Sequence, residues 1–318
     1  MTEIIPPVDK ALLQKELTSE FFVRPTNKAG NEIYDITADR CPSVMREIAR
    51  LREVTYRHAG GSKGEALDID DMDTMPKPYH QLIVWNPDEQ EIVGGYRYLD
   101  LGECVFSESG QPYITSSFLF HYSERFISEF LPHTIELGRA FVQPRYQSRE
   151  AGAKAIFALD NLWDGLGAII YNLGHAKYLI GKVTIYHDYN SLARNLIYAY
   201  MERHCRYNSG LFEPYEPIGI SREAQDMADA IFNSGDALAD MQNLKKAVRD
   251  CGSVIPPMFS AYLNLTDRLQ YFGTAMEATF SNVYDSGIMI ALDDVYQEKK
   301  ERYIGSYLEW KATADNNC

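Results

Sequence analysis

One short segment of the chain combines a buried strand with side chains that can exchange protons. The run Glu136-Leu137-Gly138-Arg139-Ala140-Phe141-Val142 is apolar enough to predict a buried strand, yet it carries a carboxylate and a guanidinium three residues apart. Burying a charge costs free energy unless the charge is paired or used, so this strand is a candidate active site. Glu136 could act as a general base, or it could form an ion pair that anchors a helix.

The residues after this strand have the features of an anion site. The strand ends before Pro144, and a loop containing Arg145 and Arg149 leads to a helix that we expect to begin near Gly152 and Lys154. Free backbone N–H groups at a helix N-terminus bind anions, and the loop adds cations. Between Arg139 and Arg206 there are nine Lys and Arg against five Asp and Glu. We therefore expect this stretch to attract an acidic partner.

Composition limits the class of protein. The 318 residues have a formal net charge of −14, which argues against a nucleic-acid partner. The five cysteines are scattered without short paired spacings, which fits a reducing cytoplasm better than a disulfide framework or a zinc site. We see no signal peptide at the start, and no apolar run approaches the roughly 20 residues of a membrane span. Peripheral attachment at the inner membrane face is compatible with the sequence.

Hydrophobic periodicity predicts a sheet covered by helices. We expect helices at 42–56, 118–130, 151–173, 191–205, 221–251 and 294–310. We expect strands at 32–36, 81–85, 91–99, 135–142 and 178–186, with later β-like stretches at 259–265 and 287–292. The second and third of these strands form a hairpin around Asn86-Pro87-Asp88. The fold class is α/β, with a mixed sheet of α+β character. No G-x-G-x-x-G motif is present to support a Rossmann fold.

Six motifs in order resemble one known family. They are Leu51-Arg52 with Tyr56, Asp70-Asp71-Met72-Asp73, His80 to Val84, Gly94 to Leu99, Glu136 to Arg139, and finally Tyr178 to Gly181 with Ile255 to Leu263. The pattern resembles the acyl-carrier-protein-dependent branch of the GNAT acyltransferases. This branch holds the bacterial ornithine and glycine N-acyltransferases of aminolipid synthesis, often labelled haemolysin-like. More distantly, it resembles the acyl-homoserine-lactone synthases.

The resemblance implies a domain plan. It predicts an N-terminal lead-in at 1–30, a GNAT-like acyltransferase domain at 31–295 with a helical insertion at about 211–250, and a C-terminal helix and tail at 296–318.

The resemblance also implies roles for individual residues. It assigns catalysis to Glu136, Arg139 and Tyr198, with Tyr198 protonating the leaving sulfur. It assigns acceptor binding, or organisation of the arginines, to the set Arg52, Tyr56, Asp70, Asp73 and Arg97. It assigns donor binding to the set Phe141, Val142, Arg145, Arg149, Gly152 and Lys154, the first two through backbone N–H groups. The loop departs from the GNAT pattern, because Arg149 to Ala153 has one glycine and an acid where the family has two small residues.

The implied activity is N-acyl transfer. A long-chain, 3-hydroxylated fatty acyl group would pass from acyl carrier protein to the α-amine of glycine or ornithine, giving a lyso-aminolipid. The donor is an acyl-phosphopantetheine thioester on the carrier protein or on coenzyme A, and no permanently bound cofactor or metal is expected. The alternatives are a coenzyme-A-dependent GNAT acetyltransferase acting on a small amine or a protein, and a catalytically silent acyl-binding module.

Overall fold

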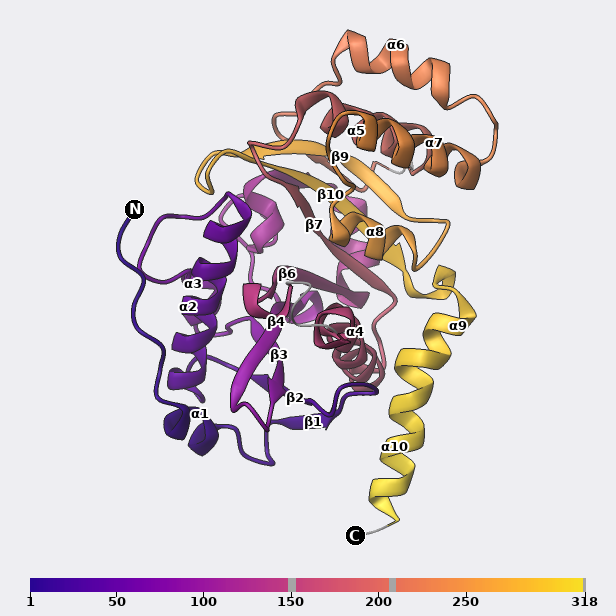
Figure 1. The fold of residues 1–318 in the computed structure, drawn as a ribbon. Helices are drawn as coiled ribbons and strands as arrows, with labels where there is room; N and C mark the ends of the chain where they lie inside the picture. Colours follow the sequence, from indigo (N-terminus) through magenta and orange to yellow (C-terminus); the bar gives the residue numbers. More distant parts are fainter. Residues whose placement is uncertain (148–152, 206–209, 317–318) are drawn as a thin grey trace. The chain divides into compact units, whose positions relative to one another are not determined.

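The computed structural model describes residues 1–147, 153–205 and 210–316, with 153–156 by their backbone alone. The chain divides into two compact units (Figure 1). The first unit comprises Met1–Cys104, His133–Lys177 and Val295–Cys318. The second comprises Val105–Pro132 and Tyr178–Asp294. Each unit is described by itself.

The first unit contains an antiparallel run of strands in the order β1-β2-β3-β4-β6. Their bounds are β1 Phe22–Pro25, β2 Glu32–Ile36, β3 His80–Asn86, β4 Glu91–Asp100 and β6 Thr134–Val142. The helices of this unit are α1 Lys10–Glu16, α2 Pro42–Ala59, α3 Asp71–Thr74, α4 Ala153–Leu173, α9 Gln297–Lys300 and α10 Ser306–Asp315. Strand β1 lies within the stretch that we expected to be a lead-in, and it pairs with β2.

Helices α2 and α4 cover opposite faces of these strands (Figure 1). Adjacent residues of a strand point to opposite faces, and the two faces carry different partners. Gln81 of β3 contacts Arg52 of α2. Its neighbour Leu82 lies against α4, where an added Cβ on Gly165 would meet its side chain. The sheet therefore has one polar, α2-facing side and one apolar, α4-facing side at this point.

Local sequence explains the bounds of the site-bearing elements. Helix α2 begins with Pro42, whose fixed φ suits the first helical turn, and ends at Gly60 in the left-handed region with φ 96°. The predicted β3–β4 hairpin is confirmed, and its turn is fixed by Asn86. The side-chain oxygen of Asn86 accepts hydrogen bonds from the amides of Asp88 and Glu89, both at 3.0 Å.

The second unit holds a three-stranded antiparallel run, β7-β10-β9, and a two-stranded sheet, β5-β8. Its strands are β5 Phe120–Tyr122, β7 Tyr178–Ile185, β8 Phe212–Pro214, β9 Gln270–Glu277 and β10 Val283–Ala291. Its helices are α5 Ser191–His204, α6 Arg222–Ile231, α7 Ala237–Asp250 and α8 Pro257–Leu263. Helices α6 and α7 lie in the stretch expected to be a helical insertion.

Two sequence predictions are wrong. The stretch 259–265 was expected to be β-like but lies mostly in helix α8, which begins directly after Pro256. Proline is favoured in the first turn of a helix, and a short apolar run does not distinguish the two structures. The stretch 118–130 was expected to be helical, but it contains β5, and only Phe126–Phe130 turns as a π-helix. The rings of Phe120 and Tyr122 are buried against Phe212, which favours an extended chain here.

The predicted fold class, α/β with a mixed sheet, is confirmed. Strand β9 was not predicted. Among residues 1–147, 153–205 and 210–316, none of the helices has the length and apolar character required to cross a bilayer.

The packing of α4 generates a stability prediction. An ideal Cβ on Gly167 would lie 2.6 Å from the carbonyl oxygen of Tyr303, which is backbone and cannot swing aside. We therefore expect Gly167→Ala to lower the free energy of unfolding by about 1–3 kcal/mol, measured by urea denaturation. Gly305→Ala is the matched control, because its nearest neighbours lie 3.9 Å away. An unchanged free energy for Gly167→Ala would contradict this packing.

Candidate active site

Strand β6 contains a β-bulge at its charged residues. Gly95 of β4 pairs with Phe141 and Arg97 pairs with Gly138, so one residue of β4 faces two residues of β6, Arg139 and Ala140. Arg139 has φ 50°, in the left-handed region that costs a non-glycine residue about 1–2 kcal/mol. A bulge redirects side chains. On a regular strand Glu136 and Arg139, three residues apart, would point to opposite faces of the sheet. Here the side chain of Arg139 contacts Asp70, the aspartate that Arg97 also contacts.

A buried cluster of ions lies between α2 and the polar face of the sheet. The guanidinium of Arg52 contacts Asp73 at 3.1 Å, and that of Arg97 contacts Asp73 at 3.1 Å and Asp70 at 2.5 and 3.0 Å. Arg52, Arg97 and Asp73 are all 0% exposed. Gln81 completes the cluster, donating to Asp73 and accepting from Arg52. Every charge therefore has an opposite charge in contact, which is the condition for burying such groups.

The loop that supplies the aspartates is held by its own capping interactions. Asp70 is the N-cap of α3, and its side chain accepts from the amide of Met72, while Asp73 accepts from the amide of Asp70 at 3.2 Å. This reciprocal arrangement is a capping box. It fixes both carboxylates toward the two arginines. The sequence left open whether Asp70 and Asp73 organise Arg52 and Arg97 or bind the acceptor. In the structure Asp73 contacts both guanidiniums and Asp70 contacts that of Arg97.

Arg139 and Asp70 form the more accessible end of this cluster. Arg139 contacts Asp68 at 3.2 Å and Asp70 at 3.4 Å, and its side chain is 18% exposed. The Asp70 side chain is 22% exposed. Lys63 lies 3.7 Å from Asp70 and 3.8 Å from Asp68. A cation and an anion therefore lie side by side at the least buried part of the cluster.

The electrostatics of the cluster keep its groups charged. Burial alone would raise the pKa of Asp70, but the Arg97 guanidinium, with Arg139 and Lys63, holds it well below its usual range. Burial likewise opposes ionisation of Asp73, and Arg52 with Arg97 lowers its pKa. The pKa of Arg97 is raised by Asp73 and Asp70 against the effect of its burial. Asp70 is therefore a poor proton acceptor at neutral pH and a good anchor for a cation.

Glu136 lies on the same face of the sheet, 1% exposed. The Tyr79 hydroxyl donates a hydrogen bond to its carboxylate oxygen Oε2. The thiol of Cys104 is close enough to the Glu136 carboxylate for an electrostatic interaction. Burial, and then the negative charge of Glu136, raises the pKa of Cys104 to about 11. A buried carboxylate on a strand can exchange a proton with a substrate directly or through one water.

The register of β6 sets the direction of the amides next to the bulge. The amide of Gln143 donates to the carbonyl of Val93 in β4, at 3.0 Å. Since successive amides of an antiparallel strand alternate in direction, the Val142 amide points away from β4 and the Phe141 amide points toward it. This register favours Val142 over Phe141 for the predicted contact with a carbonyl oxygen. Tyr56 lies near the bulge, its hydroxyl 3.4 Å from the carbonyl oxygen of Ala140.

Other predicted residues are not brought into this cluster. Tyr198 lies on α5 of the second unit, 1% exposed, and burial raises the pKa of its phenol. Arg145 is exposed and forms ion pairs with Glu89 and Glu91. Three further predictions fall outside what the structure describes: Arg149, Gly152 and the side chain of Lys154.

Sequence reasoning missed two members of the site. Gln81 had a signal, since it is a polar residue in the otherwise apolar run Gln81-Leu82-Ile83-Val84-Trp85. Tyr79 had none, because it is one of 22 tyrosines and follows a proline-containing loop.

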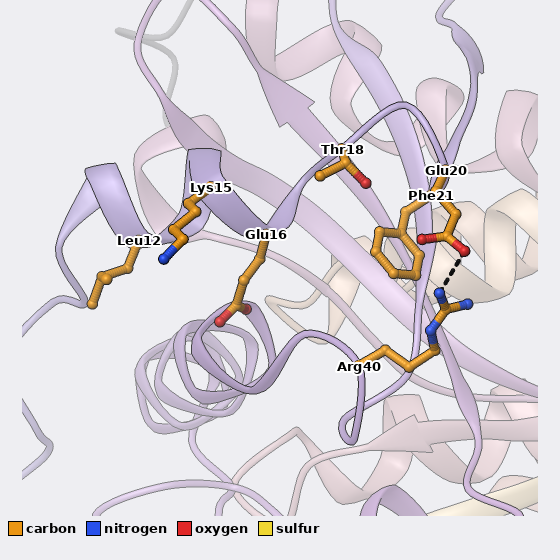
Figure 2. A pocket seen from close by; sticks show the side chains of 7 residues that line it. All are labelled: Leu12, Lys15, Glu16, Thr18, Glu20, Phe21 and Arg40. Atoms are coloured by element: carbon orange, nitrogen blue, oxygen red, sulfur yellow. Dashed lines mark hydrogen bonds and ion pairs between the residues drawn. The ribbon is translucent and has the colours of Figure 1, made fainter.

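A surface hollow of about 380 Å³ lies elsewhere in the first unit (Figure 2). Its walls are Leu12, Lys15, Glu16, Thr18, Glu20, Phe21 and Arg40. Figure 2 shows Arg40 turned toward Glu20 beside the ring of Phe21, and these two side chains form an ion pair. None of the site residues described above lines this hollow, and it is not a candidate for the chemistry.

The chain is similar to one family model over part of its length and to two known proteins over nearly all of it. Residues 51–155, which include most of the site, match the family described as Acetyltransferase (GNAT) domain. A protein named glycine N(alpha)-acyltransferase from Bacteroides thetaiotaomicron is 45% identical over 309 residues, which is 97% of this chain and 91% of the relative. One of the same name from Phocaeicola vulgatus is 43% identical over 309 residues, covering 97% of this chain and 94% of the relative.

A solved structure was also found. It is a CoA-dependent acyl-homoserine lactone synthase, BjaI, with SAM and isopentyl-CoA, at 13% identity and a TM-score of 0.31. The match covers 67% of this chain and 99% of that chain. A superposition this loose carries no argument about the site.

The ion cluster predicts how stability depends on pH. Because Asp70 and Asp73 have lowered pKa values when folded, unfolded aspartates take up protons first as the pH falls. We therefore expect the free energy of unfolding to fall progressively below about pH 5. Asp73→Asn should be less stable at pH 7 by about 3–5 kcal/mol, because it leaves a buried guanidinium short of a partner. It should also show a shallower acid dependence.

Chemical denaturation from pH 7 to pH 3 measures both effects. Glu129→Gln is the control, because its partner Arg125 and Glu129 itself are more than half exposed, and it should change stability at pH 7 by less than about 1 kcal/mol. An Asp73→Asn protein as stable as wild type at pH 7 would contradict the pairing.

Proposed function

This chain belongs to the glycine N(alpha)-acyltransferase family and carries a GNAT domain, and from that premise we propose that it acylates the α-amine of glycine. The prediction that it is an N-acyltransferase is confirmed by these relatives. The names of both relatives favour glycine over ornithine as the acceptor. The proposed acyl group is long-chain and 3-hydroxylated, and it comes from acyl carrier protein. The product is an N-acylglycine, the lyso form of an aminolipid.

One observation carries the choice of an amino-acid acceptor. Asp70 and Arg139, 3.4 Å apart, are the accessible anion and cation of the cluster. Glycine presents an ammonium and a carboxylate separated by a single carbon, and this pair is complementary to it. The guanidinium of Arg139 is well shaped for the carboxylate, and Asp70 stays charged to attract the ammonium. Arg52, Arg97 and Asp73 are fully buried, so we infer that they position this pair rather than touch glycine.

The reaction needs a free amine and a polarised carbonyl. The ammonium of glycine loses a proton, which passes to Glu136 directly or through a water. The amine nitrogen then attacks the thioester carbonyl, a C–N bond forms, and the carbonyl oxygen gains negative charge. The Val142 amide would stabilise that charge. The nitrogen gives up a second proton as the amide forms, the C–S bond breaks, and the phosphopantetheine sulfur leaves as a thiolate and takes up one proton in its place. The role of Tyr198 as its donor stays a prediction.

We take acyl carrier protein as the acyl donor because of the family resemblance. Acyl carrier protein is acidic, and Arg145 could contact it, although Arg145 already pairs with Glu89 and Glu91. The contributions of Arg149, Gly152 and Lys154 stay predictions, as does a cytoplasmic location with attachment at the inner membrane face.

An assay of donors and acceptors tests the proposed function. We expect purified protein to form N-(3-hydroxyacyl)glycine from 3-hydroxyacyl carrier protein and glycine, detected by mass spectrometry. Glu136→Gln should lower kcat by about 10²- to 10⁴-fold while the melting temperature is retained. Ornithine in place of glycine, and acyl-CoA or acetyl-CoA in place of the carrier, should give lower kcat/KM. Preferential turnover of acetyl-CoA, or of another amine, would contradict the proposal.

The acceptor contact is tested separately. Arg139→Gln should raise KM for glycine by about 10- to 100-fold, because a charge-assisted hydrogen bond to the carboxylate is lost. KM for the acyl donor should change much less. Arg125→Gln, at an exposed pair in the second unit, is the control and should leave both constants unchanged. An unchanged KM for glycine in Arg139→Gln would remove Arg139 from the acceptor site.

A further inference from the structure

Tyr79 connects the buried ion cluster to Glu136. Its side chain is 0% exposed, and its hydroxyl donates to Oε2 of Glu136. Its ring lies under the guanidinium of Arg97, with 5.1 Å between the carbon of the guanidinium and the ring centroid. A cation over an aromatic face is an attractive contact that strengthens when water is excluded.

The backbone of Tyr79 is held on both sides. Its amide donates to the carbonyl of Met72 in α3, at 2.8 Å. Its carbonyl accepts from the side chain of Gln81, at 3.2 Å. Gln81 is itself fixed by Asp73 and Arg52. The phenol therefore has little freedom to turn, and it takes its direction from the charged cluster.

We propose that Tyr79 is a positioning residue for Glu136 in acyl transfer. By donating to Oε2, the phenol hydroxyl fixes the plane of the carboxylate that receives the proton from the amine. This inference rests on the proposed role of Glu136 as the base.

The same geometry gives the ion cluster a function. Arg97 holds the ring of Tyr79, and Gln81 holds its backbone, so the buried charges orient the base without touching the substrate. A purely structural cluster would need neither contact with the residue that binds Glu136.

Tyr79→Phe tests the inference, since it keeps the ring beneath Arg97 and removes only the hydroxyl. We expect kcat to fall by about 10- to 100-fold, as for loss of a hydrogen bond to a charged group. Tyr98→Phe is the matched control. Tyr98 is also a buried tyrosine that donates to a carboxylate, that of Asp35 at 2.7 Å, but it lies on the other face of the sheet.

A double-mutant cycle shows whether Tyr79 acts through Glu136. In the Glu136→Gln background, Tyr79→Phe should change kcat by far less than in wild type, because the two residues act as one unit. Incorporating 3-fluorotyrosine at position 79 provides a variant that preserves the fold. Its phenol keeps a hydrogen-bond donor to Glu136, so kcat should be retained, unlike in Tyr79→Phe.

The outcomes separate this inference from the proposed function. If Glu136→Gln keeps its kcat, the assignment of Glu136 as the base fails. If Glu136→Gln is inactive while Tyr79→Phe has the kcat of Tyr98→Phe, only the role of Tyr79 fails. Full additivity in the cycle would also overturn it.

Discussion

Two arginines without access to water set the main constraint on this structure. Arg52 and Arg97 are 0% exposed, and a buried guanidinium is tolerated only when opposite charges and hydrogen-bond acceptors surround it. Asp73 and Asp70 supply those charges. The loop that carries them must therefore fold against β3 and β4, and helix α2 must lie over the same face. The arrangement of the polar side of the first unit follows from this requirement.

The residues that we propose for catalysis adjoin that cluster. The bulge in β6 turns Arg139 toward Asp70, which gives the cluster an accessible cation next to an accessible anion. Tyr79, held by the same residues, reaches Glu136. The backbone cost of placing Arg139 in the left-handed region is offset by its contacts with two aspartates, and such local strain is common at functional sites.

The sequence predicted the elements that have a clear hydrophobic period or that belong to an ordered motif. The β3–β4 hairpin, helix α2 and strand β6 follow from apolar spacing and turn residues. The resemblance placed Arg52, Asp73 and Arg97 in one set, and the structure shows Asp73 in contact with both arginines. The bulge did not follow, because a regular strand places Glu136 and Arg139 on opposite faces. Helix α8 was mistaken for a strand because seven residues are too few to show a helical period.

The account's central claim is that glycine binds at the accessible end of the ion cluster, beside β6. A crystal structure with a bisubstrate analogue, in which the nitrogen of glycine is joined to an acyl-pantetheine, tests it most directly. We expect the glycine carboxylate within hydrogen-bond distance of Arg139, the nitrogen facing Glu136, and the acyl oxygen at the Val142 amide. An analogue bound with its carboxylate on other residues, and with Arg139 still closed onto Asp68 and Asp70, would contradict the account.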